Sequence, residues 1–323
     1  MKKLFFSLLF FCSLLLSAIE PGTVAKITYP CKYDNSMQPA LIMVSPDQGP
    51  RPLFVVLHTW SSDYNQCKGY GKRLLKHGAS FIAPNFRGPN TSGDKLAMGS
   101  DAAISDIIDA VEYMKKNYNI DTKRIYLIGG SGGGYMSLLT GARHPEIWAG
   151  IASFCPISDL VRWHAERRGI NYGAQIAAIV GNPQTDPAAK AEAMRRSPVT
   201  WLAGIKVPLD IVAGINDRTV SATHAVRAFN CVAAKADRIP EADINYIALN
   251  RKVPAHYPEI KELLAKRKIF LRRVSGNVRL TLFNAGHVIL PDAGIRWLLR
   301  QHKDKPADFT SISGSGKTEK LGK

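Results

Sequence analysis

The chain has 323 residues, 46% of them hydrophobic and 21% charged, which suits one large α/β domain and excludes disorder of the whole chain. Its formal net charge of +17 would suit a nucleic-acid binder, but the basic residues are spread along the chain without alternating aromatics and without a groove-reading motif. We therefore expect no nucleic-acid partner and interpret the excess charge as a solvated basic face.

Residues 1–18 have the pattern of a secretory signal peptide. Two lysines follow the first methionine, residues 4–16 form an almost uninterrupted apolar run, and the small residues Ser17 and Ala18 come next. The apolar run is short for a membrane span. We therefore predict cleavage after Ala18, no stable membrane insertion, and a secreted or periplasmic protein.

Strand-like and helical patterns alternate through the rest of the chain. Helical spacing of apolar residues is found near 65–76, at 101–117 and at 135–143. Apolar runs predict strands at 24–29, 41–44, 53–58, 81–83, 125–128, 149–154, 209–213 and 278–283. The alternation favours the α/β class, with a mostly parallel sheet covered by helices on both faces.

Two inserts and a tail depart from this alternation. Residues 159–203 are helical between two predicted strands, which favours a small cap over the sheet. Residues 234–268 are a second insert, which is polar and which we expect to be helical. Residues 303–323 are basic, with Ser and Gly toward the end, so we expect a disordered tail. The remaining residues, 19–302, are expected to form a single domain.

The strongest chemical signal lies where the predicted strand at 125–128 ends. There the chain reads Gly129-Gly130-Ser131-Gly132-Gly133, and a helix-compatible segment follows. A G-x-S-x-G pattern between a strand and a helix is typical of a nucleophile elbow, which exposes the serine at the carboxyl end of the sheet. Neither a phosphate-binding loop, which needs Lys and then Ser or Thr after its last glycine, nor a dinucleotide fingerprint fits. We therefore predict Ser131 as a nucleophile and expect no cofactor.

A serine hydroxyl needs a base beside it to act as a nucleophile. In enzymes built around such an elbow the acid and then the histidine follow the serine in the chain, each on a loop after a later strand. Asp217 and His287 each come just after a predicted strand. We predict His287 as the general base and Asp217 as the acid that orients it, with Asp237 and Asp243 in the second insert as fallbacks for the acid.

The oxyanion of a tetrahedral intermediate needs two N–H donors. The first is expected from Gly132, next to Ser131. The second is expected from the loop after the strand at 53–58, where Trp60 is the first candidate and Thr59 the second. The same two residues are candidates for substrate binding, with the Trp60 ring lining an acyl pocket.

Four cysteines remain beyond the predicted signal, namely Cys31, Cys67, Cys155 and Cys231. An oxidising compartment permits disulfides, and the three full pairings of four cysteines stay open. No pair has C-x-x-C spacing, so we expect no metal cluster. Cys155 follows an apolar run, and we interpret it as a buried thiol.

These pieces together resemble the catalytic domain of the prolyl oligopeptidase family and the related acyl esterases of the α/β-hydrolase superfamily. The resemblance implies an α/β-hydrolase fold and a serine hydrolase that needs no metal or organic cofactor, with a structural role for Arg87. It extends over residues 52–300 and rests on Leu57 to Trp60, Asn85 to Gly88, Gly129 to Gly133, Ser197-Pro198, Gly214 to Val220 and Gly286-His287.

Three features depart from the family pattern. Few residues precede Leu53, so we expect no propeller domain of the kind that filters peptides in true oligopeptidases. The His-Gly usual after the oxyanion strand is His58-Thr59 here, and the insert at 234–268 lengthens the chain between Asp217 and His287. These departures weaken the expectation of a peptidase.

Three functions are therefore considered. The first is a secreted carboxylesterase that cleaves small acyl esters, such as acetyl or aromatic groups on plant or algal polysaccharide, through Ser131, Asp217 and His287. The alternative is a serine peptidase that uses the same residues on short peptides. The third is a non-catalytic protein that binds carbohydrate or a surface. The oligomeric state is left open.

Overall fold

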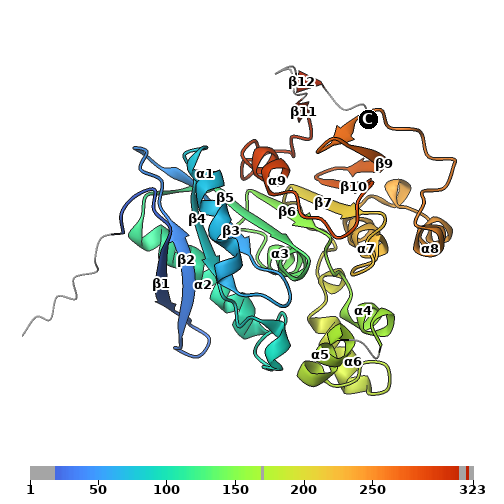
Figure 1. Ribbon diagram of the computed structural model, residues 1–323, viewed down its shortest axis with the longest axis horizontal. Helices are drawn as coiled ribbons and strands as arrows, with labels where there is room; N and C mark the ends of the chain where they lie inside the picture. The colour runs from blue at the N-terminus through green and yellow to red at the C-terminus, as the bar shows by residue number, and fades with distance from the viewer. Residues whose placement is uncertain (1–18, 169–170, 313–317, 320–323) are drawn as a thin grey trace, which may run out of the picture.

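The computed structural model describes residues 19–168, 171–312 and 318–319, so the predicted signal peptide lies outside the described residues. They form a ten-stranded sheet in the order β1-β2-β4-β3-β5-β6-β7-β10-β9-β8, with helices on both faces (Figure 1). The strands from β4 to β10 in this order run parallel, and antiparallel strands extend the sheet at both edges. The predicted α/β class with a mostly parallel sheet is confirmed.

The bounds of the elements are as follows. The strands are β1 (Ala25–Pro30), β2 (Met37–Met43), β3 (Arg51–Leu57), β4 (Ser80–Pro84), β5 (Ile120–Gly130), β6 (Gly150–Phe154), β7 (Leu209–Gly214), β8 (Leu263–Leu264), β9 (Arg267–Ser275), β10 (Val278–Phe283), β11 (Ser311–Ile312) and β12 (Thr318–Glu319). The α-helices are α1 (Gly69–Leu75), α2 (Asp101–Asn117), α3 (Gly132–Arg143), α4 (Leu160–Glu166), α5 (Asn171–Val180), α6 (Pro187–Arg195), α7 (Ala222–Val232), α8 (Glu241–Asn250) and α9 (Pro291–Leu298). Short 3-10 helices are η1 (Tyr64–Lys68), η2 (Asn90–Ser92), η3 (Pro198–Thr200) and η4 (Lys235–Asp237).

Every strand and helix predicted before the second insert is present, with ends that move by a few residues. The helix predicted at 101–117 is α2, with the same bounds. Its start is set by Ser100, whose side-chain oxygen accepts the N–H of Ala103 at 3.1 Å, and by the acidic Asp101 in the first turn. The observed helix therefore follows both from the apolar spacing and from the cap.

Two hydrophobic cores lie on the two faces of the sheet, and alternate residues of β3 enter each. Leu53 and Val55 face the core that contains residues of α2, α3 and α7. Phe54 and Val56 face the other core, against α1 and α9. A strand with both faces buried needs the continuous apolar run seen in the sequence, because period-2 alternation would leave one face polar.

The helical segment at 159–203 forms α4, α5, α6 and η3 between β6 and β7. Trp163 of α4 joins it to the loops at the carboxyl ends of the strands. Its ring lies 4.9 Å from the ring of Trp60, and its indole N–H donates to the Thr219 carbonyl at 3.1 Å. A second link joins Glu166 to the buried His224 of α7 at 3.2 Å. The predicted cap is therefore present, and it borders the loops that follow β3 and β7.

The prediction of a helical second insert is wrong for much of residues 234–268. Only η4 and α8 are helical there, residues 251–262 lie in neither helix nor strand, and β8 and the start of β9 form an antiparallel hairpin. The strand was missed because β9 is basic. Its apolar residues Ile269 and Leu271 are buried in the two opposite cores, because the register against β10 shifts between them, so the strand lacks a regular alternation.

The predicted boundary of the tail is also wrong, because residues 303–309 pack against the domain. The Trp297 indole N–H donates to the Asp308 carbonyl at 2.9 Å, and Phe309 stacks on the Trp297 ring with 5.8 Å between ring centres. The aromatic stacking supplies the apolar contact that basic composition alone did not indicate. No helix in the described part of the chain is long and apolar enough to span a membrane.

Candidate active site

Ser131 lies on a sharp turn between β5 and α3, as the predicted elbow requires. Its backbone has φ 55° and ψ −120°, a conformation that L-residues disfavour and that marks a strained functional turn when it is held by its surroundings. The Ser131 N–H donates to the Phe154 carbonyl at 2.8 Å, and the Ser131 carbonyl accepts from the Tyr135 N–H at 2.8 Å. The neighbouring strand β6 and the first turn of α3 therefore hold the turn in place.

The glycines of the elbow are required by close backbone approach. A Cβ on Gly129 would overlap the Gly133 backbone, and a Cβ on Gly133 would overlap the carbonyl oxygen of Leu57 at the end of β3. The G-x-S-x-G spacing thus lets β5, α3 and β3 meet behind Ser131.

A Gly133→Ala variant should be destabilised by about 2 kcal/mol or more, because the added methyl group overlaps rigid backbone and forces β3 and the elbow apart. The free energy of unfolding, measured by urea titration, checks this. Gly69→Ala is the matched control, since a Cβ there meets nothing within 4 Å. Equal unfolding free energies for the two variants would contradict the described elbow.

Asp217 and His287 are brought together by the loops after β7 and β10. The His287 Nδ1 lies 2.6 Å from an Asp217 side-chain oxygen. The other oxygen of Asp217 accepts the backbone N–H groups of Thr219 and Val220 at 2.8 and 3.0 Å. The carboxylate is fully buried, while the His287 side chain is 27% exposed. This arrangement fixes the imidazole and leaves its other nitrogen, Nε2, without a hydrogen-bond partner among the described residues.

The loop after β10, which carries His287 and is called the histidine loop below, lies beside the serine elbow. The Cys155 thiol directly after β6 donates to the Val288 carbonyl at 3.3 Å, and a Cβ on Gly130 would overlap the side chain of Ile289. No hydrogen bond joins Ser131 Oγ to His287 among the described residues. Hydrogen bonds of this kind are often long in free enzymes and shorten when substrate binds. The structure thus brings the three predicted residues to one edge of the sheet.

The structure distinguishes between the two candidates for the second oxyanion donor. A Cβ on Gly132 would overlap the backbone nitrogen of Trp60, so these two backbone groups are in contact. The N–H of Gly132, at the first position of α3, has no partner within the helix. The Thr59 N–H donates to the Gln66 side chain at 2.9 Å, which removes Thr59 as a donor. Of the two candidates Trp60 and Thr59, only Trp60 keeps an N–H without an acceptor in the described part of the chain.

The Trp60 ring does not line an open pocket, contrary to the expectation from sequence. Its side chain is buried against Trp163, and its indole N–H donates to the Gln175 side chain of α5 at 2.7 Å. Gln66 and Gln175 were both missed in the sequence analysis, because glutamine has no motif and the Trp60–Gln175 contact spans 115 positions. Through these two hydrogen bonds, the loop after β3 contacts η1 and the cap.

Arg87 has the structural role that the resemblance implied. Its guanidinium group lies 2.9 Å from Asp106 of α2 and 2.8 Å from Asp34 in the loop between β1 and β2. The hydrogen bond from Arg87 holds the pKa of Asp34 well below its usual range, with Ser36 adding to the effect. Arg87 thereby ties the edge of the sheet to a covering helix.

All four cysteines in the described residues are free thiols. Cys155 also belongs to a cluster with Asp217 and His287 in which one potential ligand atom from each lies within 4.8 Å of the others. Burial raises the pKa of Cys155 to about 12, and the nearby Asp217 carboxylate adds to the rise. The Asp217 and His287 atoms already bind each other, and the thiol is neutral. The cluster is therefore a hydrogen-bonded acid–base pair with a buried thiol beside it.

Cys155 should remain unmodified when the native protein is treated with iodoacetamide at pH 8. With a pKa of about 12, only roughly 10⁻⁴ of the thiol is the reactive thiolate at that pH, and the side chain is buried. Peptide mass spectrometry after a timed reaction checks this, with the urea-unfolded protein as the control in which Cys155 reacts. Alkylation of native Cys155 as fast as in the unfolded chain would contradict its described environment.

Comparison with known proteins agrees with this geometry. The model of the prolyl oligopeptidase family matches residues 70–245, more than half of the chain. The chain is 28% identical over 200 residues to dipeptidyl aminopeptidase BIII of Pseudoxanthomonas mexicana, a match that covers 58% of this chain and 28% of that protein. It is 24% identical over 221 residues to the acylamino-acid-releasing enzyme of Rattus norvegicus, covering 64% of this chain and 28% of the relative.

The fold is shared with solved structures as well. The crystal structure of puromycin hydrolase superposes with a TM-score of 0.57 at 14% identity, over 85% of this chain and 37% of that one. The protein therefore has the α/β-hydrolase fold, although it spans less than a third of the length of the curated relatives named above. From the matched family model, the chain belongs to the prolyl oligopeptidase family.

Proposed function

We propose that the protein is a serine peptidase that cleaves short peptides through an acyl-enzyme formed on Ser131. The observation that carries the acyl-enzyme chemistry of this proposal is the Asp217–His287 pair, held at 2.6 Å, on loops beside a strained serine elbow. The named relatives are an aminopeptidase and an enzyme that releases acylamino acids. They support the peptidase alternative better than the carboxylesterase that the sequence analysis placed first, and they give no support to a polysaccharide ester as substrate.

In the proposed mechanism, His287 accepts the proton of Ser131 Oγ as that oxygen attacks the peptide carbonyl. Asp217 keeps the His287 Nδ1–H in place and stabilises the imidazolium ion. The N–H groups of Gly132 and Trp60 donate to the oxyanion. The C–N bond then breaks, and His287 gives its proton to the leaving amine. Water attacks the acyl-enzyme with His287 again as base, which releases the acid and restores Ser131.

We also propose that the mature protein lies outside the cytoplasm. The proposal rests on the signal pattern of residues 1–18 alone. Expression of the full chain, followed by N-terminal sequencing of the exported protein, tests it. A mature chain that begins at Ile19 would support cleavage after Ala18, and a cytoplasmic protein that keeps its first residues would refute it.

The peptidase proposal is tested with a dipeptidyl p-nitroanilide and p-nitrophenyl acetate, comparing kcat/KM for the wild type and for Ser131→Ala. We expect turnover of the anilide that depends on Ser131. Turnover of the acetate alone, also dependent on Ser131, would refute the peptidase and restore the esterase hypothesis.

A further inference from the structure

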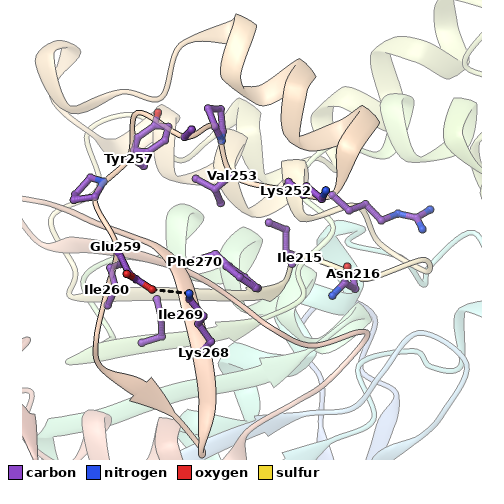
Figure 2. Close-up of a pocket in the computed structure, with 14 residues that line it drawn as sticks. Ile215, Asn216, Lys252, Val253, Tyr257, Glu259, Ile260, Lys268, Ile269 and Phe270 are labelled. Atoms are coloured by element: carbon purple, nitrogen blue, oxygen red, sulfur yellow. Dashed lines mark hydrogen bonds and ion pairs between the residues drawn. The ribbon is translucent and has the colours of Figure 1, made fainter.

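A pocket of about 500 Å³ lies beside the loop that carries Asp217. Figure 2 shows residues 251–260 arching over it, with Lys268, Ile269 and Phe270 of β9 on the opposite side. Ile215 and Asn216, just before Asp217, form a third part of the lining. Its volume is in the range of sites for small ligands.

Hydrogen bonds join the walls of this pocket to the loops of the active site. The Asn216 N–H donates to the Ala285 carbonyl at 2.9 Å, and the Asn284 N–H donates to the Lys268 carbonyl at 2.8 Å. The Asn216 amide also donates to the side chain of Asn284 at 3.2 Å. Ala285 and Asn284 immediately precede the Gly286-His287 turn. The pocket is therefore adjacent in space to both the acid loop and the histidine loop, at the carboxyl edge of the sheet.

The lining of the pocket combines an apolar surface with positive charge. Its apolar side chains are Ile215, Val253, Pro254, Ala255, Tyr257, Pro258, Ile260, Ile269 and Phe270. Its single acidic residue, Glu259, pairs with Lys268 at 2.7 Å. Arg251 and Lys252 form no ion pair with any described carboxylate. The two unpaired cations leave the pocket suited to an apolar ligand that carries a negative charge.

Arg251 lines two neighbouring cavities, of which this pocket is one. It also lines a smaller cavity of about 280 Å³ together with Glu166, Asp217 and Arg218. It ends α8 with φ 50°, a left-handed conformation that glycine or asparagine usually occupies. The long cationic side chain therefore stands at a backbone position that favours glycine or asparagine, and it is shared by this pocket and by the cavity that Asp217 lines.

We propose that this pocket binds the C-terminal residue of a peptide substrate, with the apolar side chain on its lining and the terminal carboxylate bound by Arg251. The proposal rests on the peptidase function proposed above. When Ser131 is acylated by the N-terminal part of the peptide, the C-terminal carboxylate leaves with the amine fragment. The pocket would then select the leaving group, and the second insert would make the enzyme prefer peptides with a free, apolar C-terminus.

The test compares two quenched fluorescent peptides of one sequence that end in leucine, one with a free carboxylate and one with a C-terminal amide. The wild type should cleave the free acid with a kcat/KM roughly tenfold or more above that of the amide, mainly through KM. Arg251→Gln should bring the ratio close to one, and Arg251→Lys should keep part of it. Lys235→Gln, which removes the same charge from an exposed site elsewhere in the insert, should leave the ratio unchanged.

A wild-type ratio near one, or the same ratio in Arg251→Gln, would overturn the proposal. Binding of N-acetyl-leucine and N-acetyl-leucinamide to Ser131→Ala, measured by calorimetry, separates this outcome from failure of the peptidase function. If neither peptide is cleaved but the acid binds more tightly than the amide in an Arg251-dependent way, the pocket stands and the peptidase fails. If the acid and the amide bind equally, the pocket proposal fails whatever the activity.

Discussion

A Ser131→Ala variant should lose at least about 10⁴-fold in turnover while its melting temperature stays close to that of the wild type. The hydroxyl oxygen is the atom that forms the acyl-enzyme, so its removal leaves only the oxyanion donors and substrate binding. The backbone of the elbow is held by Phe154 and Tyr135 at 2.8 Å through main-chain bonds, which the substitution keeps. Steady-state kinetics on the dipeptidyl p-nitroanilide measures the effect, with thermal unfolding of both proteins as the control.

Retention of more than a tenth of the wild-type rate by Ser131→Ala would mean that another nucleophile performs the reaction. A loss of rate together with a large fall in melting temperature would instead report a disrupted elbow. The kinetic and thermal measurements together therefore distinguish a chemical role of the hydroxyl from a structural one.

An Asp217→Asn variant should lose about 10⁴-fold in kcat. One Asp217 oxygen accepts the N–H groups of Thr219 and Val220, so the substituted amide would turn its NH₂ group toward His287 Nδ1. That nitrogen would then have to accept a proton rather than donate one, which leaves Nε2 protonated and unable to act as a base. Measurement of kcat for the variant across the neutral pH range checks this expectation.

Asp237→Asn and Asp243→Asn are the controls for this experiment, since both aspartates were fallbacks for the acid. The structure places them away from that role. Asp237 accepts the Ser275 hydroxyl at 2.7 Å, and Asp243 accepts the Tyr257 hydroxyl at 2.8 Å. Neither contacts His287 among the described hydrogen bonds. Full activity of Asp217→Asn, or a large loss of kcat in Asp237→Asn, would contradict the assignment of the acid.

The central sheet and the candidate site could be predicted from sequence because each part depends on local pattern. The run at 53–58 is continuously apolar because β3 is buried on both faces. Ser131, Asp217 and His287 could be placed together because each follows a strand of one parallel sheet, and parallel strands end at the same edge.

The features that sequence did not predict depend on contacts between distant segments. The ring of Trp60 turns into the cap because Gln175 and Trp163 bind it there, and nothing near Trp60 in the chain indicates either partner. β9 was missed because it is rich in basic residues and because a register shift against β10 places Ile269 and Leu271 in opposite cores. The pocket at Arg251 exists only because the second insert folds back onto the acid loop.

The most direct test of the account is to react the wild type with a fluorophosphonate and to locate the adduct by peptide mass spectrometry. Fluorophosphonates phosphonylate a serine whose hydroxyl is activated by a base, so the label tests the nucleophile whatever the substrate of the enzyme is. We predict one adduct per chain on Ser131, with none on Ser131→Ala. A protein that takes up no label, or that is labelled at another residue, would contradict the assignment of Ser131 as the nucleophile of a serine hydrolase.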